Sequence, residues 1–161
     1  MPDHYPYRVL TPSGDPTLLW RLGENDEPDA FLTGPDGSLL RFPDPAAAEA
    51  HCLRHGLDFF WGAGNTLDLA AARHWTEAPL LEPPASCRLL LDTWNFFTDL
   101  PGALPAEGPV HDGAYDKLFG GTALHPTSDP ASWTPAETAA VRALFTAGFA
   151  RWDLLAGPAP R

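Results

Sequence analysis

The sequence lacks several of the features by which a class of protein is usually recognised. Its two cysteines, Cys52 and Cys87, are too few for a disulfide framework in a chain of 161 residues, so we expect both to be reduced and buried. No apolar stretch approaches the length that crosses a bilayer, and residues 1–15 lack the basic and apolar regions of a secretory signal. We therefore expect a soluble, cytoplasmic protein.

Motifs of common enzyme classes are absent as well. The sequence holds no nucleophile elbow, phosphate-binding loop, zinc knuckle or dinucleotide fingerprint. Basic residues are scarce, since 10 Arg and Lys stand against 21 Asp and Glu, and the formal net charge is −11. A surface this negative repels nucleic acid and anionic lipid, so we expect neither as a partner. It favours a basic protein partner, or serves solubility alone.

The chain has what a folded domain needs. Hydrophobic residues make up 44% of it, and 6 Trp, 9 Phe and 3 Tyr are spread from Tyr5 to Trp152, unlike the aromatic-poor pattern of disorder. We expect a single domain over residues 1–161, strand-rich in 1–42 and mainly helical in 43–161. The 19 prolines and 14 glycines predict long connections between rather few regular elements.

The first 42 residues read as an antiparallel sheet of three or four strands. Two β-prone segments are separated by the turn-forming residues 12–16, and two more flank the Asp36-Gly37 pair, which is a strong hairpin signal. The four segments are Tyr5–Leu10, Thr17–Leu22, Ala30–Thr33 and Ser38–Phe42.

Two helices are predicted next. Asp44 is an N-cap acceptor before Pro45, and Gly56 is a natural C-cap, so residues 46–55 should be helical. A short helix over Asp68–Trp75 is indicated by apolar side chains at a spacing of four.

The strongest helical pattern runs from the N-cap Ser86 to Leu100. A second runs from Pro135 to about Leu155, with a capping box of Thr134 and Glu137 at its start and an interruption at Gly148. Between them we expect a Pro/Gly-rich excursion and an ordered loop pinned by Tyr115 and Phe119. The predicted buried stripes of the two helices are Leu90, Leu91, Trp94, Phe97 and Leu100, and Val141, Leu144, Phe145, Phe149 and Trp152. The fold class is therefore α+β, with an N-terminal antiparallel sheet packed against a mainly helical C-terminal portion.

Two groups of residues are candidates for binding a partner. The acidic stretch at residues 24–29 can attract a basic surface through Glu24, Asp26, Glu27 and Asp29. Trp94, Phe96 and Phe97 exceed what one helix face can bury, so Phe96 or Asn95 must point toward a second layer, a pocket or a partner. Core packing between two layers is the alternative for Phe96.

Other residues could carry chemistry. His51 and His55 have the spacing that lets two imidazoles share a metal, which Cys87, His74 or Asp58 could complete. The alternative is a solvated pair near a helix C-terminus. Asp92 and Asp99, roughly 10 Å apart on their helix, could form a water-mediated acid/base pair, or lie on its solvent face. No catalytic residue, resident metal or cofactor is assigned.

A resemblance adds to this reading. The segments Leu91–Leu100, Tyr115–Gly120 and Pro130–Glu137 are similar to a pattern found in small bacterial proteins, some of which resemble immunity proteins of toxin systems. The likeness covers the C-terminal half, and no binding residue can be transferred from it. It implies an acidic, cytoplasmic, monomeric or dimeric inhibitor that binds a cognate toxin.

Taken together, the sequence predicts a binding protein rather than an enzyme: an immunity-type inhibitor that neutralises a basic toxin or enzyme by protein contact. One alternative is a metal-dependent or acid/base hydrolase that uses His51, His55, Asp92 or Asp99. Another is a structural subunit of a larger assembly.

Overall fold

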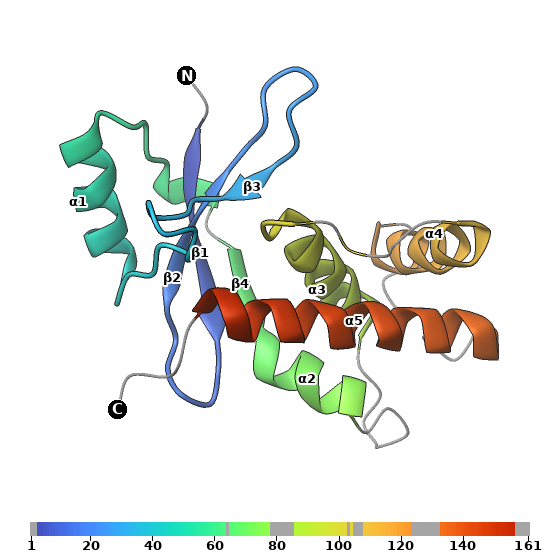
Figure 1. Ribbon diagram of the computed structural model, residues 1–161. Coiled ribbons are helices and arrows are strands. Elements are labelled where there is room, and N and C mark those ends of the chain that lie inside the picture. Colours follow the sequence, from blue (N-terminus) through green and yellow to red (C-terminus); the bar gives the residue numbers. More distant parts are fainter. Residues whose placement is uncertain are drawn as a thin grey trace. The chain divides into compact units, whose positions relative to one another are not determined.

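A computed structural model of the chain describes residues 3–63, 65–77, 86–102, 104, 108–123 and 133–156 (Figure 1). Its described residues contain a four-stranded sheet in the N-terminal part and five α-helices, most of them in the C-terminal part, which confirms the α+β prediction. They divide into two compact units that interleave along the chain. Unit 1 holds the described residues of Met1–Asp68, Asp99–Pro101 and Trp152–Arg161, and unit 2 those of Leu69–Thr98 and Gly102–Arg151.

The sheet of unit 1 is mixed rather than purely antiparallel. Its strands β1 to β4 lie in the order β3-β2-β1-β4 and span His4–Leu10, Thr17–Arg21, Ala30–Phe31 and Asn65–Asp68. Strands β1 and β2 form the predicted hairpin, whereas β4 runs parallel to β1, with Val9 opposite Leu67. The predicted antiparallel pairing is confirmed for β1, β2 and β3. The parallel strand β4 was not predicted; the chain leaves through helix α1 and returns on the far edge of β1 in the same direction.

The predicted strand Ser38–Phe42 is reduced to two isolated bridges, Thr33 with Leu39 and Thr17 with Phe42. The turn before it forms as expected, since Gly37 has a φ of +81° and Gly34 donates to the Ser38 carbonyl at 2.8 Å. The amide of Leu39 donates to the Leu155 carbonyl at 3.3 Å, at the end of the last helix. This segment therefore bonds to several neighbours instead of one strand.

One face of the sheet packs against α1, which spans Pro45–His55. Leu19 of β2 forms a buried cluster with Ala48 and Cys52 of this helix. The predicted caps are confirmed, because Asp44 accepts a hydrogen bond from the Ala47 amide at 2.8 Å and Gly56 has a φ of +66°. A short 3₁₀ helix, η1 at Trp61–Ala63, comes before β4.

Unit 2 is built from helices. These are α2 at Leu69–Glu77, α3 at Cys87–Asp99, α4 at Pro109–Ala123 and α5 at Pro135–Ala156. The last residue of α3, Asp99, and the last turn of α5, from Trp152 on, belong to unit 1. Every residue of the two predicted stripes is buried, with Leu90, Phe97, Val141 and Phe145 fully so. The stripes were predicted correctly because the 3.6-residue period by itself decides which side chains share a helix face.

Helix α4 replaces the loop that the sequence predicted. It runs through Gly113, Gly120 and Gly121, although each glycine costs about 1 kcal/mol relative to alanine in a helix. Ala114 and Leu118 are completely buried on one of its faces. Tertiary packing therefore outweighs the poor helix propensity of this segment.

Helix α5 begins with the predicted capping box. Thr134 Oγ1 accepts from the Glu137 amide at 3.2 Å, and Glu137 Oε2 accepts from the Thr134 amide at 3.0 Å. The same carboxylate accepts a hydrogen bond from Lys117 Nζ at 2.8 Å, which joins α4 to α5. Among the helices in the described ranges, none combines the length and the apolar character needed to span a bilayer.

Candidate functional site

Three aromatic side chains of unit 1, Tyr5, Trp20 and Phe60, form what we call the aromatic cluster. Tyr5 and Trp20 are directly opposite in the β1–β2 register, so both project from the same face of the sheet, and their ring centroids are 5.7 Å apart. Phe60 is held beside them because its amide donates to the His4 carbonyl at 2.9 Å, and its ring also lies 5.7 Å from that of Tyr5. Phe60 is 44% exposed, while Tyr5 and Trp20 are partly buried.

A carboxyl group adjoins this cluster. Trp20 Nε1 donates to Asp99 Oδ2 at 3.0 Å, across 79 positions of sequence. Burial raises the pKa of Asp99 to about 6, the bond from Trp20 acts in the opposite direction, and the negative charge of Asp29 raises it further. Asp99 is also the last residue of α3, where the helix dipole disfavours a negative charge. In the part of the chain that the structure describes, no cationic side chain is among the groups that shift its pKa.

The acidic stretch forms an ordered turn, which we call the acidic loop, Glu24–Asp29. Gly23 lies so close to the Glu27 carbonyl that a Cβ at position 23 would overlap with it. The Glu27 amide donates to the Glu24 carbonyl at 3.1 Å, and Asp29 Oδ1 accepts from the Gly23 amide at 2.8 Å. Bonds across both ends of the loop therefore define its shape.

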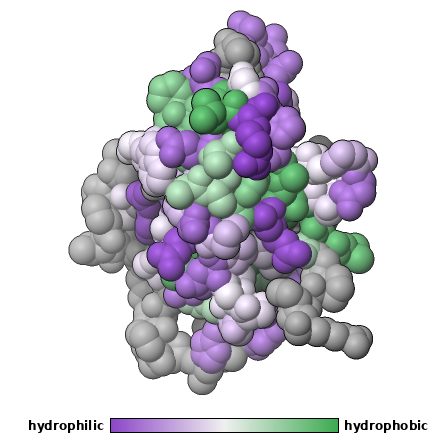
Figure 2. Space-filling model, turned by 90° about the vertical axis from the view of Figure 1, so that its left-hand side faces the viewer, coloured by the Kyte–Doolittle hydropathy of each residue, from purple (hydrophilic) through white to green (hydrophobic). Residues whose placement is uncertain are grey.

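The acidic loop exposes the side chains of Glu24, Asp26 and Glu27, whereas Asp29 is partly buried. Glu27 is paired with Arg21 at 3.6 Å, an exposed ion pair worth little in stability. Figure 2 shows one face of the molecule, with the same vertical axis as Figure 1. Hydrophilic surface predominates at its top, which is the height of the β2–β3 connection in Figure 1, and apolar surface lies below this region. This loop thus presents negative charge to solvent.

The loop and the cluster are connected through Leu22 and Asp3. Leu22 joins β2 to the loop and is exposed, and its amide donates to the Asp3 carbonyl at 3.2 Å. Asp3 Oδ2 accepts from the Tyr5 hydroxyl at 3.3 Å. Unit 1 therefore carries partly exposed aromatic rings, an exposed apolar side chain and several carboxylates in one region.

The predicted metal ligands His51 and His55 lie next to each other. The imidazole rings of His51 and His55 have centroids 4.3 Å apart, and burial together with the charges of His55 and Arg54 lowers the pKa of His51. His51 also contacts Phe42, with centroids 5.2 Å apart. Within the part of the chain that the structure describes, no three His, Cys, Asp or Glu side chains are grouped closely enough to hold a metal ion.

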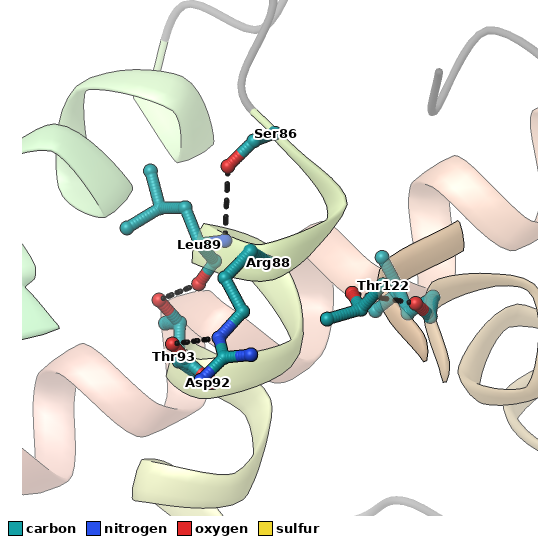
Figure 3. A network of polar contacts seen from close by, with 7 residues as sticks. Ser86, Arg88, Leu89, Asp92, Thr93 and Thr122 are labelled. Carbon is teal, nitrogen blue, oxygen red and sulfur yellow. Dashed lines mark hydrogen bonds and ion pairs between the residues drawn. The ribbon is translucent and has the colours of Figure 1, made fainter. Parts of the chain in front are cut away.

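The predicted acid/base pair is not assembled. Asp92 Oδ2 accepts from Arg88 Nε at 3.0 Å near the N-terminus of α3, where Ser86 Oγ caps the Leu89 amide at 3.1 Å (Figure 3). Asp99 is bonded to Trp20 instead. A carboxyl with a pKa near 6 can exchange protons at neutral pH, but acid/base hydrolysis also needs a second group aimed at the same substrate.

Phe96 does not offer a surface to a partner. Its side chain is 1% exposed and packs against Phe97, with ring centroids 5.7 Å apart. The residue that points outward is Asn95, whose Oδ1 accepts from the Tyr115 hydroxyl at 3.1 Å. The predicted contact of Phe96 with a partner is therefore corrected, because this ring is buried in the structure, as the alternative of core packing expects.

Sequence reasoning missed the aromatic cluster and the link from Trp20 to Asp99. The alternation of β1 and β2 could have placed Tyr5 and Trp20 on one face, but no local signal brings Phe60 or Asp99 to them. Comparison with protein-family models, curated proteins and solved structures found no match for this chain. Its function is therefore argued from the site alone.

Proposed function

We propose that this chain is a binding protein that recognises a basic protein partner through the acidic loop and the adjoining aromatic cluster. The observation that carries the proposal is the fixed turn that exposes Glu24, Asp26 and Glu27 beside partly exposed rings. An ordered loop loses little conformational freedom on binding, so its charges can act without a large entropic cost.

The two parts of the site have different roles. Exposed carboxylates raise the rate at which a basic partner arrives, because long-range attraction steers diffusion. Aromatic side chains supply the contacts that slow dissociation, since they dominate binding energy at protein interfaces. The net charge of −11 extends the attraction beyond the loop itself.

An immunity-type inhibitor is the form of this function that we favour. Toxins that act on nucleic acid have basic active-site surfaces, and an acidic protein of this size can cover such a surface. The proposal includes a cytoplasmic location, where the inhibitor would meet its toxin, and a monomeric or homodimeric state.

The test begins with affinity capture and identification of the retained protein, and then measures association with that purified partner as salt is raised. The variant Glu24→Gln/Asp26→Asn/Glu27→Gln should associate about tenfold more slowly at low salt and lose most of the salt dependence. A matched control, Glu77→Gln/Asp112→Asn/Asp116→Asn, removes the same charge from exposed side chains of unit 2. A partner that is not basic, or equal rates for the two variants, would contradict the proposal.

A further inference from the structure

Among the described residues of unit 1, no cationic side chain acts on the Asp99 carboxylate. It is partly buried, the Trp20 indole occupies one of its oxygens, and the nearby charge that acts on it is that of another carboxylate, Asp29. Partly buried carboxylates are normally paired with a cation. Arg21, the cation that follows Trp20 in β2, is paired with Glu27.

We propose that Asp99 and the aromatic cluster together form a site for one arginine side chain of the partner, so that the guanidinium group is the missing cation. This inference rests on the proposed function and names the kind of partner side chain that the site binds. The faces of Tyr5, Trp20 and Phe60 supply stacking surface, and Asp99 Oδ1, the oxygen not bonded to Trp20, supplies an acceptor.

Arginine fits the site formed by Asp99 and the aromatic cluster better than other classes of ligand do. A planar guanidinium stacks on aromatic rings and donates to a carboxylate at the same time, whereas the compact lysine ammonium is strongly hydrated. An anionic group would be repelled by Asp99 and Asp29. A neutral polar ligand would leave the charge of Asp99 without compensation.

The stability of the fold gives a second argument. An asparagine at position 99 could accept the same hydrogen bond from Trp20 Nε1 without placing a charge in a partly buried position at the end of a helix. The negative charge is therefore not needed to hold Trp20 in place. Binding sites often keep groups that lower stability, so we attribute the charge of Asp99 to ligand binding.

The experiment uses N-acetyl-arginine amide as the probe and follows the Trp20 indole N–H signal by NMR, assigned by its loss in Trp20→Phe. We expect a saturable shift with this probe and none with N-acetyl-citrulline amide, which has the same shape without the charge. Asp99→Asn should weaken binding about tenfold. Asp92→Asn, which neutralises an aspartate of the same helix at the Arg88 ion pair, should leave it unchanged.

The other possible outcomes of these NMR and association experiments separate the inference from the proposed function. No shift with the arginine probe, or equal shifts with citrulline, would overturn the inference, and the salt-dependent association with a basic partner would still test the proposed function separately. Equal affinity for N-acetyl-lysine amide would overturn the assignment to a guanidinium. If arginine binds at Trp20 but the acidic-loop variant and its control associate equally with the partner, the proposed function fails and this site remains.

Discussion

Gly148, in the second half of α5, lies so close to the ring of Phe97 in α3 that a Cβ at position 148 would overlap with the ring atoms Cγ and Cδ2. Phe97 is completely buried and also contacts Phe149 edge to face, with centroids 4.9 Å apart. The sequence predicted an interruption of the helix at this glycine, but α5 continues through it from Pro135 to Ala156. The absence of a side chain at Gly148 therefore allows α5 to pack closely against the Phe97 ring of α3.

The variant Gly148→Ala should therefore destabilise the protein. The added methyl group forces Phe97 or the backbone to move, and such overpacking of a core costs about 1–3 kcal/mol. This loss exceeds the helix-propensity gain of about 1 kcal/mol that alanine normally brings. Urea denaturation should show a lower midpoint than that of the wild type.

Gly120→Ala is the matched control for this substitution. Gly120 is also inside a helix, α4, but an added Cβ there would meet no atom within 4 Å. The propensity gain of about 1 kcal/mol should then appear as increased stability. Equal changes in the two variants would show that the close approach at Gly148 has no energetic effect.

Asp99 should make stability depend on pH. Its pKa is raised from 3.8 to about 6 in the folded protein, so the folded state binds the proton more tightly, and stability falls as pH rises through this range. A shift of this size corresponds to about 3 kcal/mol, which water reduces to about 1–2 kcal/mol at a partly exposed group. Urea titrations of wild type and Asp99→Asn should therefore coincide near pH 4 and separate above pH 6, where the variant is more stable. A constant difference across this range would contradict the assignment.

Asp29 should influence Asp99 through its charge and the acidic loop through its hydrogen bond. Asp29→Asn keeps an acceptor for the Gly23 amide and removes the negative charge, so the pKa of Asp99 should fall toward its usual value. Asp29→Ala removes both and should also lower the free energy of unfolding by about 1 kcal/mol. Carboxyl NMR titration and urea denaturation separate the two effects. An unchanged pKa of Asp99 in both variants would show that the two carboxylates do not interact.

The two cysteines should be unreactive in the folded protein. Cys52 and Cys87 are both buried, and burial together with the charge of Glu49 raises the pKa of the Cys52 thiol. The thiolate is the reactive form, so both burial and a high pKa slow modification. A chromogenic disulfide reagent should label neither residue in buffer and both in denaturant. Rapid labelling of one thiol in buffer would show that its part of the core opens.

Elements that local signals define could be predicted from the sequence. The caps of α1 and the capping box of α5 lie within a few residues of the helix ends, and the structure forms both as expected. The hairpin of β1 and β2 is local in the same sense. In these places the residues that decide the structure are neighbours in the chain.

Elements that depend on distant contacts could not be predicted. Residues 65–68 form β4 because they pair with β1, about sixty positions earlier, and only Leu67 in this strand is buried. Helix α4 contains glycines that indicate a loop, and its buried contacts overcome them. Asp99 was recognised as a candidate, but on the expectation of a pair with Asp92, because nothing near it in the sequence points to Trp20.

The interleaving of the two units has a consequence for how this protein is made. Trp152 is buried in unit 1, and the Leu155 carbonyl accepts a hydrogen bond from Leu39. A ribosome delivers the sheet before these residues, so unit 1 can acquire its complete set of contacts only after α5 has been synthesised. A nascent chain halted before α5 would leave the ribosome with its N-terminal unit still lacking these contacts.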